Sequence, residues 1–202
     1  MALVSTKEGT LDKAVVREWC KKYHYAKRVP SISFAYGWTN DETGELEAVL
    51  AIGKPASNAL CEGVCGKENR GFVFELQRIC AKPELSIPLS RFVGEVLRIL
   101  PNLILVSYAD TAWGHFGTIY QATNWIYTGA TRPRTDIATG KHSRHYEKAE
   151  SYPNRVARSS KHRYIIFTGD KRFKKALRKE LKYPVQDYPK GKSNTYQIDW
   201  SK

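Results

Sequence analysis

The chain has 202 residues, of which 42% are hydrophobic and 26% charged, a composition typical of a globular protein. No stretch approaches the roughly 18 apolar residues of a membrane-spanning helix, and the first ten residues lack the apolar run of a secretory signal. We therefore expect a single domain over residues 1–202, with no membrane attachment and a cytoplasmic location.

The formal net charge of +13 is concentrated in one segment. Residues 1–131 hold 14 Lys and Arg against 13 Asp and Glu, whereas residues 132–182 hold 16 against 5, a net charge of +11. Such a segment can neutralise the phosphates of a nucleic acid, although it can also be a solvated basic face without a partner. We expect nucleic-acid binding at about 132–182, with candidate contacts at Arg132, Arg134, Lys171, Arg172, Lys174 and Lys175.

The first half of the chain predicts a helix, a hairpin and a central strand. The expected elements are a helix over 11–23 capped by Thr10, strands over 31–38 and 46–52 joined by a turn at 40–44, a loop over 53–71, and a strand over 72–79. In the last strand, Arg78 is expected on the same face as Phe72, Phe74 and Leu76. A guanidinium following three apolar side chains requires an anionic partner or a cleft.

The second half alternates helices with strands. The expected elements are a helix over 89–100 stopped by Pro101, a buried strand over 103–108, a loop over 109–117, a helix over 118–124, strands at 125–127 and 164–167, and a helix over 171–182 capped by Asp170. This order predicts an α/β fold with a mixed central sheet and flanking helices. It resembles the GCN5-related N-acetyltransferase fold.

The cysteines are expected to be free thiols, because their spacings fit no common zinc pattern. They are Cys20, Cys61, Cys65 and Cys80.

Candidate site residues follow the buried strand and the first helix. Asp110 leaves the strand over 103–108, where ligands tend to bind, and can accept a proton or hydrogen-bond an amine; the alternative is a turn aspartate that binds its own backbone. His115 can pair with it. His24 ends the first helix, where a histidine also stabilises the helix dipole. Aromatic side chains near these positions can form a stacking pocket for a nucleobase or pack in the core: Tyr25, Trp113, Tyr120, Trp125 and Tyr127.

The sequence resembles the Mom family of phage-encoded DNA adenine modification proteins. The motifs that carry the resemblance are Tyr23-His24-Tyr25, residues 53–57, residues 75–78, Ser107-Tyr108-Ala109-Asp110, and residues 114–125, with a weaker similarity at 163–169. The resemblance implies an acetyltransferase-like fold and conversion of adenine N6 in double-stranded DNA to a carbamoylmethyl derivative, which blocks host restriction.

The resemblance also implies functional residues. It points to His24, Tyr25, Arg78 and Asp110, to which we add Ser107 as catalytic and Tyr108, Trp113, His115 and Tyr120 as a base pocket. It also implies iron as a candidate cofactor, for which the sequence assigns no ligands. The expected location becomes the cytoplasm of the phage's host.

The sequence leaves two chemical classes open for the donor of the transferred group. The interval Cys80–Pro88 has no glycine, so the usual phosphate-binding loop for coenzyme A is not expected. An acyl-coenzyme A and a glycine-derived donor such as glycyl-tRNA are both considered, the latter making tRNA a partner. Two other functions compete: an N-acetyltransferase for a small-molecule or protein amine, and a phage DNA-binding protein without catalysis.

Overall fold

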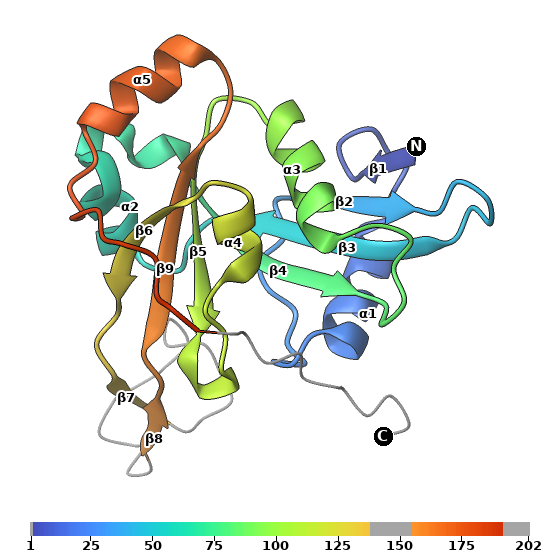
Figure 1. Ribbon diagram of the computed structural model, residues 1–202, viewed down its shortest axis with the longest axis horizontal. Coiled ribbons are helices and arrows are strands. Elements are labelled where there is room, and N and C mark those ends of the chain that lie inside the picture. Colours follow the sequence, from blue (N-terminus) through green and yellow to red (C-terminus); the bar gives the residue numbers. More distant parts are fainter. Residues whose placement is uncertain (1, 138–154, 192–202) are drawn as a thin grey trace.

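The computed structural model describes residues 2–137 and 155–191. In these residues a seven-stranded mixed sheet runs through the molecule in the order β1-β2-β3-β4-β5-β9-β6, and a separate ribbon is formed by β7 and β8 (Figure 1). The strands are β1 (Ala2–Ser5), β2 (Phe34–Thr39), β3 (Leu46–Gly53), β4 (Val73–Ala81), β5 (Ile104–Asp110), β6 (Ile126–Ala130), β7 (Arg134–Ile137), β8 (Arg155–Arg158) and β9 (Lys161–Phe167). The predicted α/β fold with a mixed sheet is confirmed.

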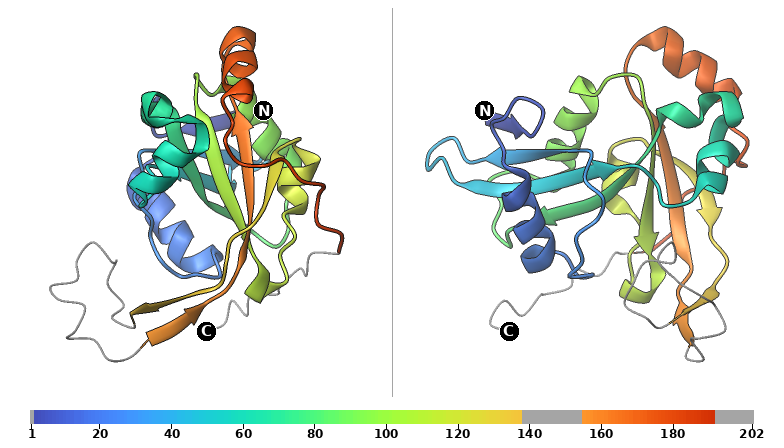
Figure 2. Two further views of the ribbon diagram at one scale, coloured as in Figure 1. Left: turned by 90° about the vertical axis from the view of Figure 1, so that its left-hand side faces the viewer. Right: turned by 180° about the vertical axis from the view of Figure 1, so that it is seen from behind.

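Helices cover both faces of the sheet (Figure 2). They are α1 (Lys13–Tyr23), α2 (Asn58–Cys65), α3 (Leu89–Ile99), α4 (Thr118–Ala122) and α5 (Lys171–Lys179), with short 3-10 turns η1 (Lys67–Phe72) and η2 (Thr111–Trp113). One face is packed by α3 and α4 around Phe92 and Trp125. The other face is packed by α1 over β2 and β3, and by α2 and α5 over β5 and β9.

Most predicted elements are found, with shifted ends. The first helix begins at Lys13 and is capped by Asp12, whose side chain accepts a hydrogen bond from the amide of Ala14 at 2.8 Å, so the Thr10 cap was wrong. The hydroxyl of Thr10 instead accepts a hydrogen bond from the amide of Ser5 at 2.8 Å. The helix 171–182 ends at Lys179, but its predicted cap is confirmed, because Asp170 accepts a hydrogen bond from the amide of Phe173.

Three predictions about strands and loops were wrong. The expected loop at 53–71 contains α2 and η1. Strands β1, β7 and β8 were not predicted. Arg78 does not share a face with Leu76: Ile52 opposes Leu76 and Ala51 opposes Arg78, so Gln77 is an extra residue in a β-bulge that shifts the alternation by one position. Arg78 therefore lies on the α1 face.

All four cysteines are free thiols, as predicted. None of the helices in the described ranges is both long enough and apolar enough to cross a membrane.

Candidate functional site

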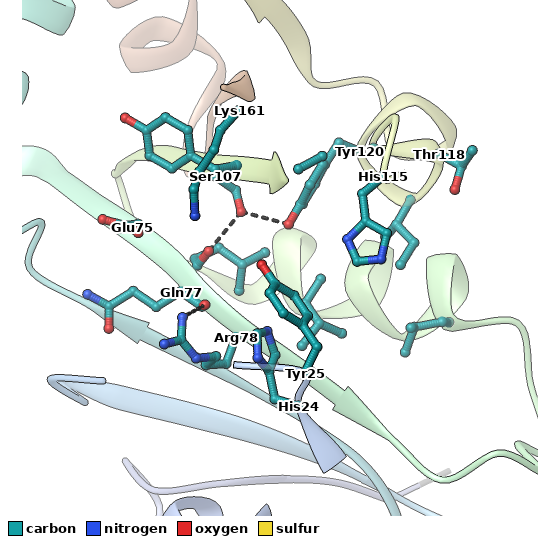
Figure 3. Close-up of a pocket in the computed structure, with 17 residues that line it drawn as sticks. His24, Tyr25, Glu75, Gln77, Arg78, Ser107, His115, Thr118, Tyr120 and Lys161 are labelled. Atoms are coloured by element: carbon teal, nitrogen blue, oxygen red, sulfur yellow. Dashed lines mark hydrogen bonds between the residues drawn. The ribbon is translucent and has the colours of Figure 1, made fainter. Parts of the chain in front are cut away.

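A cavity of about 400 Å³ lies where β4 and β5 separate. The two strands pair in parallel over Val73–Glu75 and Ile104–Val106, after which β4 continues along β3 and β5 along β9. Figure 3 shows Tyr120 and His115 on one side of this space, Glu75 and Arg78 on the other, and Ser107 between them. The gap in the sheet thus gives a ligand access to side chains from both halves of the sheet.

Ser107 bridges the two strands at the point where they part. Its hydroxyl donates to the backbone carbonyl of Leu76 at 2.7 Å and lies 2.7 Å from the hydroxyl of Tyr120. Because the carbonyl can only accept, the Tyr120 hydroxyl donates to Ser107. Burial raises the pKa of Tyr120 to about 12. Both hydroxyls therefore keep their protons near neutral pH and fix the cavity wall.

Aromatic rings gather at one edge of the cavity. Tyr25 lies 4.3 Å from His24, 5.0 Å from Trp113 and 5.5 Å from His115, measured between ring centroids. Trp113 is 44% exposed, so part of its ring remains open to a ligand. This aromatic edge, defined as His24, Tyr25, Trp113 and His115, joins the end of α1 to the η2 loop and offers flat surfaces on which a nucleobase can stack.

His24 is a neutral hydrogen-bond donor in this setting. Burial lowers its pKa to about 3, and the positive charge of Arg78 contributes. Its Nδ1 accepts a hydrogen bond from the amide of Ala26 at 3.1 Å, which assigns the proton to Nε2. Burial also lowers the pKa of His115. Neither ring adds a positive charge to the cavity at neutral pH.

Arg78 and Glu75 place opposite charges in the cavity. The Arg78 guanidinium donates to the backbone carbonyls of Arg28 and Gln77 at 3.3 and 2.6 Å, which leaves further N–H donors for a ligand. Burial raises the pKa of Glu75, and the charges of Arg78 and Lys161 oppose that rise. A carboxyl group with a raised pKa in a cavity is suited to proton transfer.

Both carboxylate oxygens of Asp110 have hydrogen-bond or ion-pair partners. Its Oδ1 accepts from the hydroxyl of Ser159 at 2.5 Å and the amide of Ala112 at 3.1 Å, and its Oδ2 lies 2.9 Å from Nζ of Lys161. Burial would raise the pKa of Asp110, but the hydrogen bonds from Ser159 and Lys161 hold it below its ordinary value. Asp110 therefore stays charged and holds the Lys161 side chain at the cavity. The hydrogen bond that joins it to His115 is between backbone atoms.

Gly117 shapes the entry to α4. It has a φ of +77° and lies against the ring of Tyr164, so a side chain here would meet both backbone strain and the aromatic ring. The chain thereby turns tightly from the aromatic edge into the helix that carries Tyr120.

The predicted basic contacts fall on two separate surfaces. Arg132 and Arg134 lie beside and within the β7–β8 ribbon, whereas the four basic residues predicted at 171–175 lie on α5, at the opposite end of the molecule (Figure 2). The strand β9 separates the two, and its seven residues span about 20 Å. Residues 138–154 of the basic segment lie outside the described residues.

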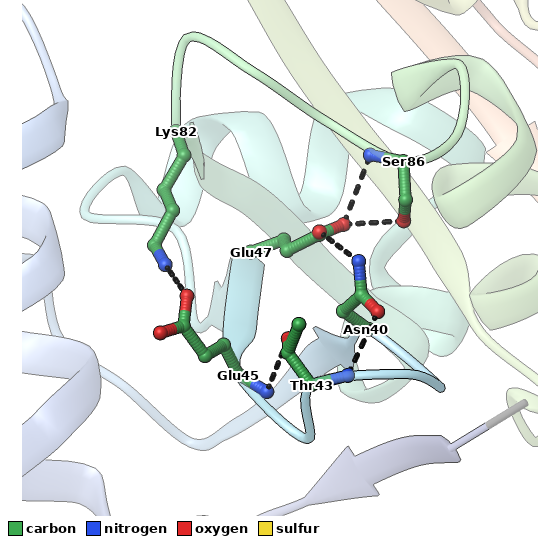
Figure 4. A network of polar contacts seen from close by, with 6 residues as sticks. All are labelled: Asn40, Thr43, Glu45, Glu47, Lys82 and Ser86. Atoms are coloured by element: carbon green, nitrogen blue, oxygen red, sulfur yellow. Dashed lines mark hydrogen bonds and ion pairs between the residues drawn. The ribbon is translucent and has the colours of Figure 1, made fainter.

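The loop before α3 does not fit the pyrophosphate of coenzyme A. Glu47, which is 7% exposed, accepts hydrogen bonds from the Ser86 amide at 3.1 Å, the Ser86 hydroxyl at 2.5 Å and Nδ2 of Asn40 at 2.7 Å (Figure 4). Burial would raise its pKa, but these hydrogen bonds lower it overall. A carboxylate that these hydrogen bonds keep charged thus contacts the chain three residues before the start of α3 and repels phosphate.

Iron finds no ligand set in the described ranges. Within residues 2–137 and 155–191, no group of three or more His, Cys, Asp or Glu side chains is close enough to hold a metal ion. We therefore assign no iron ligands and derive no step through a metal.

Most sequence-predicted site residues converge on the cavity. Lining it are His24, Tyr25, Arg78, Ser107, Tyr108, His115 and Tyr120, while Asp110 and Trp113 contact lining residues. Burial raises the pKa of Tyr108, so its hydroxyl stays protonated. Sequence reasoning missed Glu75 and Lys161. A carboxylate within an otherwise apolar central strand is the signal that could have identified Glu75.

Comparisons with known proteins point to one family. The family model described as the Mom protein family matches residues 8–190. An acetyltransferase of the GNAT family from Bacillus cereus ATCC 10987, known from a crystal structure, has a TM-score of 0.39 and 9% identity, covering 67% of this chain and 71% of that chain. No match was found among curated proteins.

Proposed function

Because the chain belongs to the Mom protein family, we propose that it is a DNA modification enzyme that transfers a carbamoylmethyl group to N6 of adenine in double-stranded DNA. Such a modification protects phage DNA from host restriction. The observation that carries the proposal is the cavity at the β4–β5 gap, which combines the aromatic edge with a carboxyl group of raised pKa and an arginine with open donors. Its volume of about 400 Å³ is in the range of ligand sites.

The target adenine leaves the base stack and enters the cavity. Enzymes that act on a base within a duplex extrude it and stack it between aromatic side chains. In this protein Tyr25 and Trp113 provide the stacking surface, and the Nε2–H of His24 is a donor suited to a ring nitrogen of the base.

The chemical difficulty is the weak nucleophilicity of N6, whose lone pair is delocalised into the ring. Glu75 is the group placed to take a proton from N6, because its pKa is raised and its side chain makes no hydrogen bond within the described ranges. Arg78 is placed to hold a carbonyl oxygen of the donor as negative charge develops there. Asp110 acts indirectly, by keeping Lys161 at the cavity.

An activated glycine is the donor we favour. N6 attacks the carbonyl of a glycyl ester such as glycyl-tRNA, the C–O bond breaks, and the leaving ribose hydroxyl takes the proton. The free glycyl amine then attacks C6 through a five-membered ring, the bond between C6 and the original nitrogen breaks, and that nitrogen becomes the carboxamide. The product is carbamoylmethyladenine, and neither step needs an oxidant or a reductant.

Mass spectrometry of nucleosides from cells that express the protein tests the function. Carbamoylmethyladenine supports the proposal, and unmodified adenine refutes it in favour of a DNA-binding protein without catalysis or an N-acetyltransferase for other amines. Feeding ¹⁵N-glycine tests the donor. Label on the nitrogen attached to C6 supports the rearrangement, whereas label confined to the carboxamide, or no label, refutes it.

A further inference from the structure

A two-stranded ribbon stands beside the cavity. Strands β7 and β8 pair antiparallel, with Arg134 opposite Arg158 and Ile137 opposite Arg155, and form a sheet separate from the central one. Both views in Figure 2 show the ribbon extending from the end of the central sheet that is opposite to α5. A projecting ribbon of this kind is free to enter a groove that the body of the protein cannot enter.

The base of the ribbon is fixed to the cavity wall. Strand β8 ends at Arg158, three residues before Lys161, and the intervening Ser159 donates to Asp110. The carbonyl of Ser160 accepts from both the amide and the hydroxyl of Thr111, at 3.2 and 2.7 Å, which joins the ribbon to the η2 loop. Anything held by the ribbon is therefore held at a defined position relative to the cavity.

The described part of the ribbon carries an excess of positive charge. Its strands hold three arginines and one aspartate, and Arg132 lies two residues before them. Arg134 and Arg155 are exposed, and Nε of Arg155 donates to the hydroxyl of Thr135 at 2.9 Å. Arg134 and Arg158 are cross-strand neighbours, so two of the arginines lie close together on the ribbon.

Resting on the proposed function, we propose that the β7–β8 ribbon enters the major groove of the duplex at the target adenine. The major groove, about 12 Å wide, accepts a two-stranded ribbon, and it is the groove in which adenine displays its N6 amino group. A ribbon inserted there brings N6 to the side of the duplex that faces the cavity. Its arginines contact phosphates and base edges, while the aromatic edge receives the extruded base.

The α5 surface is too far away to take part in this contact. It lies beyond the far end of β9, about 20 Å or more from Lys161. An eight-base-pair hairpin stem centred on the target adenine extends only about 14 Å to each side of it, which is short of α5. Binding of this short duplex therefore depends on the ribbon and not on α5.

Binding measurements on the eight-base-pair stem test the inference. One variant removes two ribbon charges, Arg134→Ala with Arg155→Ala, and its matched control removes two α5 charges, Lys171→Ala with Lys174→Ala. All four side chains are exposed, so the melting temperatures of both variants should equal that of the wild type. Fluorescence anisotropy over a range of salt concentrations should show the log–log slope reduced by about 1.8 in the ribbon variant and unchanged in the control.

Groove-specific probes complete the test. Pyrimidines with 5-propynyl groups, which fill the major groove, should weaken wild-type binding at least tenfold, whereas netropsin in the minor groove should leave it unchanged. Displacement by netropsin, tolerance of the propynyl groups, or an unchanged slope in the ribbon variant would overturn the inference. Nucleoside analysis is a separate readout. If duplex binding depends on the ribbon but no modified adenine is found, the proposed function is refuted and the inference about the ribbon stands. If modified adenine is found but duplex binding does not depend on the ribbon, only this inference is refuted.

Discussion

Replacing Asp110 by asparagine should leave the protein folded but measurably less stable. The substitution removes the charge that faces Nζ of Lys161 at 2.9 Å and weakens the hydrogen bonds from Ser159 and Ala112. Hydrogen bonds to a charged group contribute about 1.5–3 kcal/mol, and the Lys161 side chain is 39% exposed, which favours the lower part of that range. We expect the free energy of unfolding to fall by about 2 kcal/mol.

This decrease converts into a shift of the melting temperature. Unfolding entropies near 2.1 cal/mol/K per residue give about 0.42 kcal/mol/K for a chain of 202 residues, so 2 kcal/mol corresponds to about 5 °C. Thermal unfolding followed by circular dichroism at pH 7 measures it. Asp12→Asn is the matched control, because asparagine caps a helix as well as aspartate does, and its melting temperature should be unchanged.

The dependence on pH adds a sharper test. The pKa of Asp110 is lowered in the folded protein, so its stabilisation is complete above the unfolded pKa, near 3.9, and is lost as the pH falls through the folded pKa. The gap between wild type and Asp110→Asn should therefore narrow below about pH 4. A gap that is absent at pH 7, or constant down to about pH 3, would refute the assignment of Asp110 as the charged partner of Lys161. Modification should also fall sharply, because Lys161 is no longer held at the cavity.

Three further predictions concern the reaction and the DNA. Glu75→Gln should lower modification at least 100-fold without weakening DNA binding, and retained activity would exclude Glu75 as the proton acceptor. The rate of modification by the wild type should fall with decreasing pH through a pKa above that of an ordinary glutamate. Trp113→Ala should weaken capture of the target base about 5- to 150-fold, the value of one stacking contact, while Trp113→Phe retains most of it, as followed by 2-aminopurine fluorescence at the target position. On long duplexes, alanine at the four basic positions of 171–175 should reduce the salt slope by about 0.9 for each phosphate that is no longer neutralised, and an unchanged slope would remove α5 from the interface.

The elements that position the site are predictable where burial imposes a pattern. Strand β5 is almost continuously apolar and is recognisable from that run, and α3 from its single apolar stripe. Elements without such patterns escape prediction. The sequence of β7 is Arg-Thr-Asp-Ile, which has no alternation. The described side chains of the ribbon, at 134–135 and 155–158, are exposed or half-buried, so burial imposes no pattern on them.

The sequence names many of the residues that line the cavity but not how they are arranged. His24, Tyr25 and Arg78 line it, but the bulge at Gln77 that sets the face of Arg78 leaves no mark on a single sequence. Lys161 comes from a strand about 50 residues beyond Asp110, and their contact depends on the pairing of β9 with β5. Long-range pairing of this kind is set by the tertiary fold and not by local pattern.

The short pairing of β4 with β5 divides the sheet along a mechanical seam. Strands β1 to β4 all come from residues 2–81, and β5, β6 and β9 all come from residues 104–167, so the seam also separates two contiguous pieces of the chain. The hydrogen bond from the Ser107 hydroxyl to the Leu76 carbonyl joins the two halves at the point where β4 and β5 separate. The core cluster around Phe92 and Trp125 also spans both halves of the sheet, so the width of the cleft is set by the packing of that core and not by strand pairing alone.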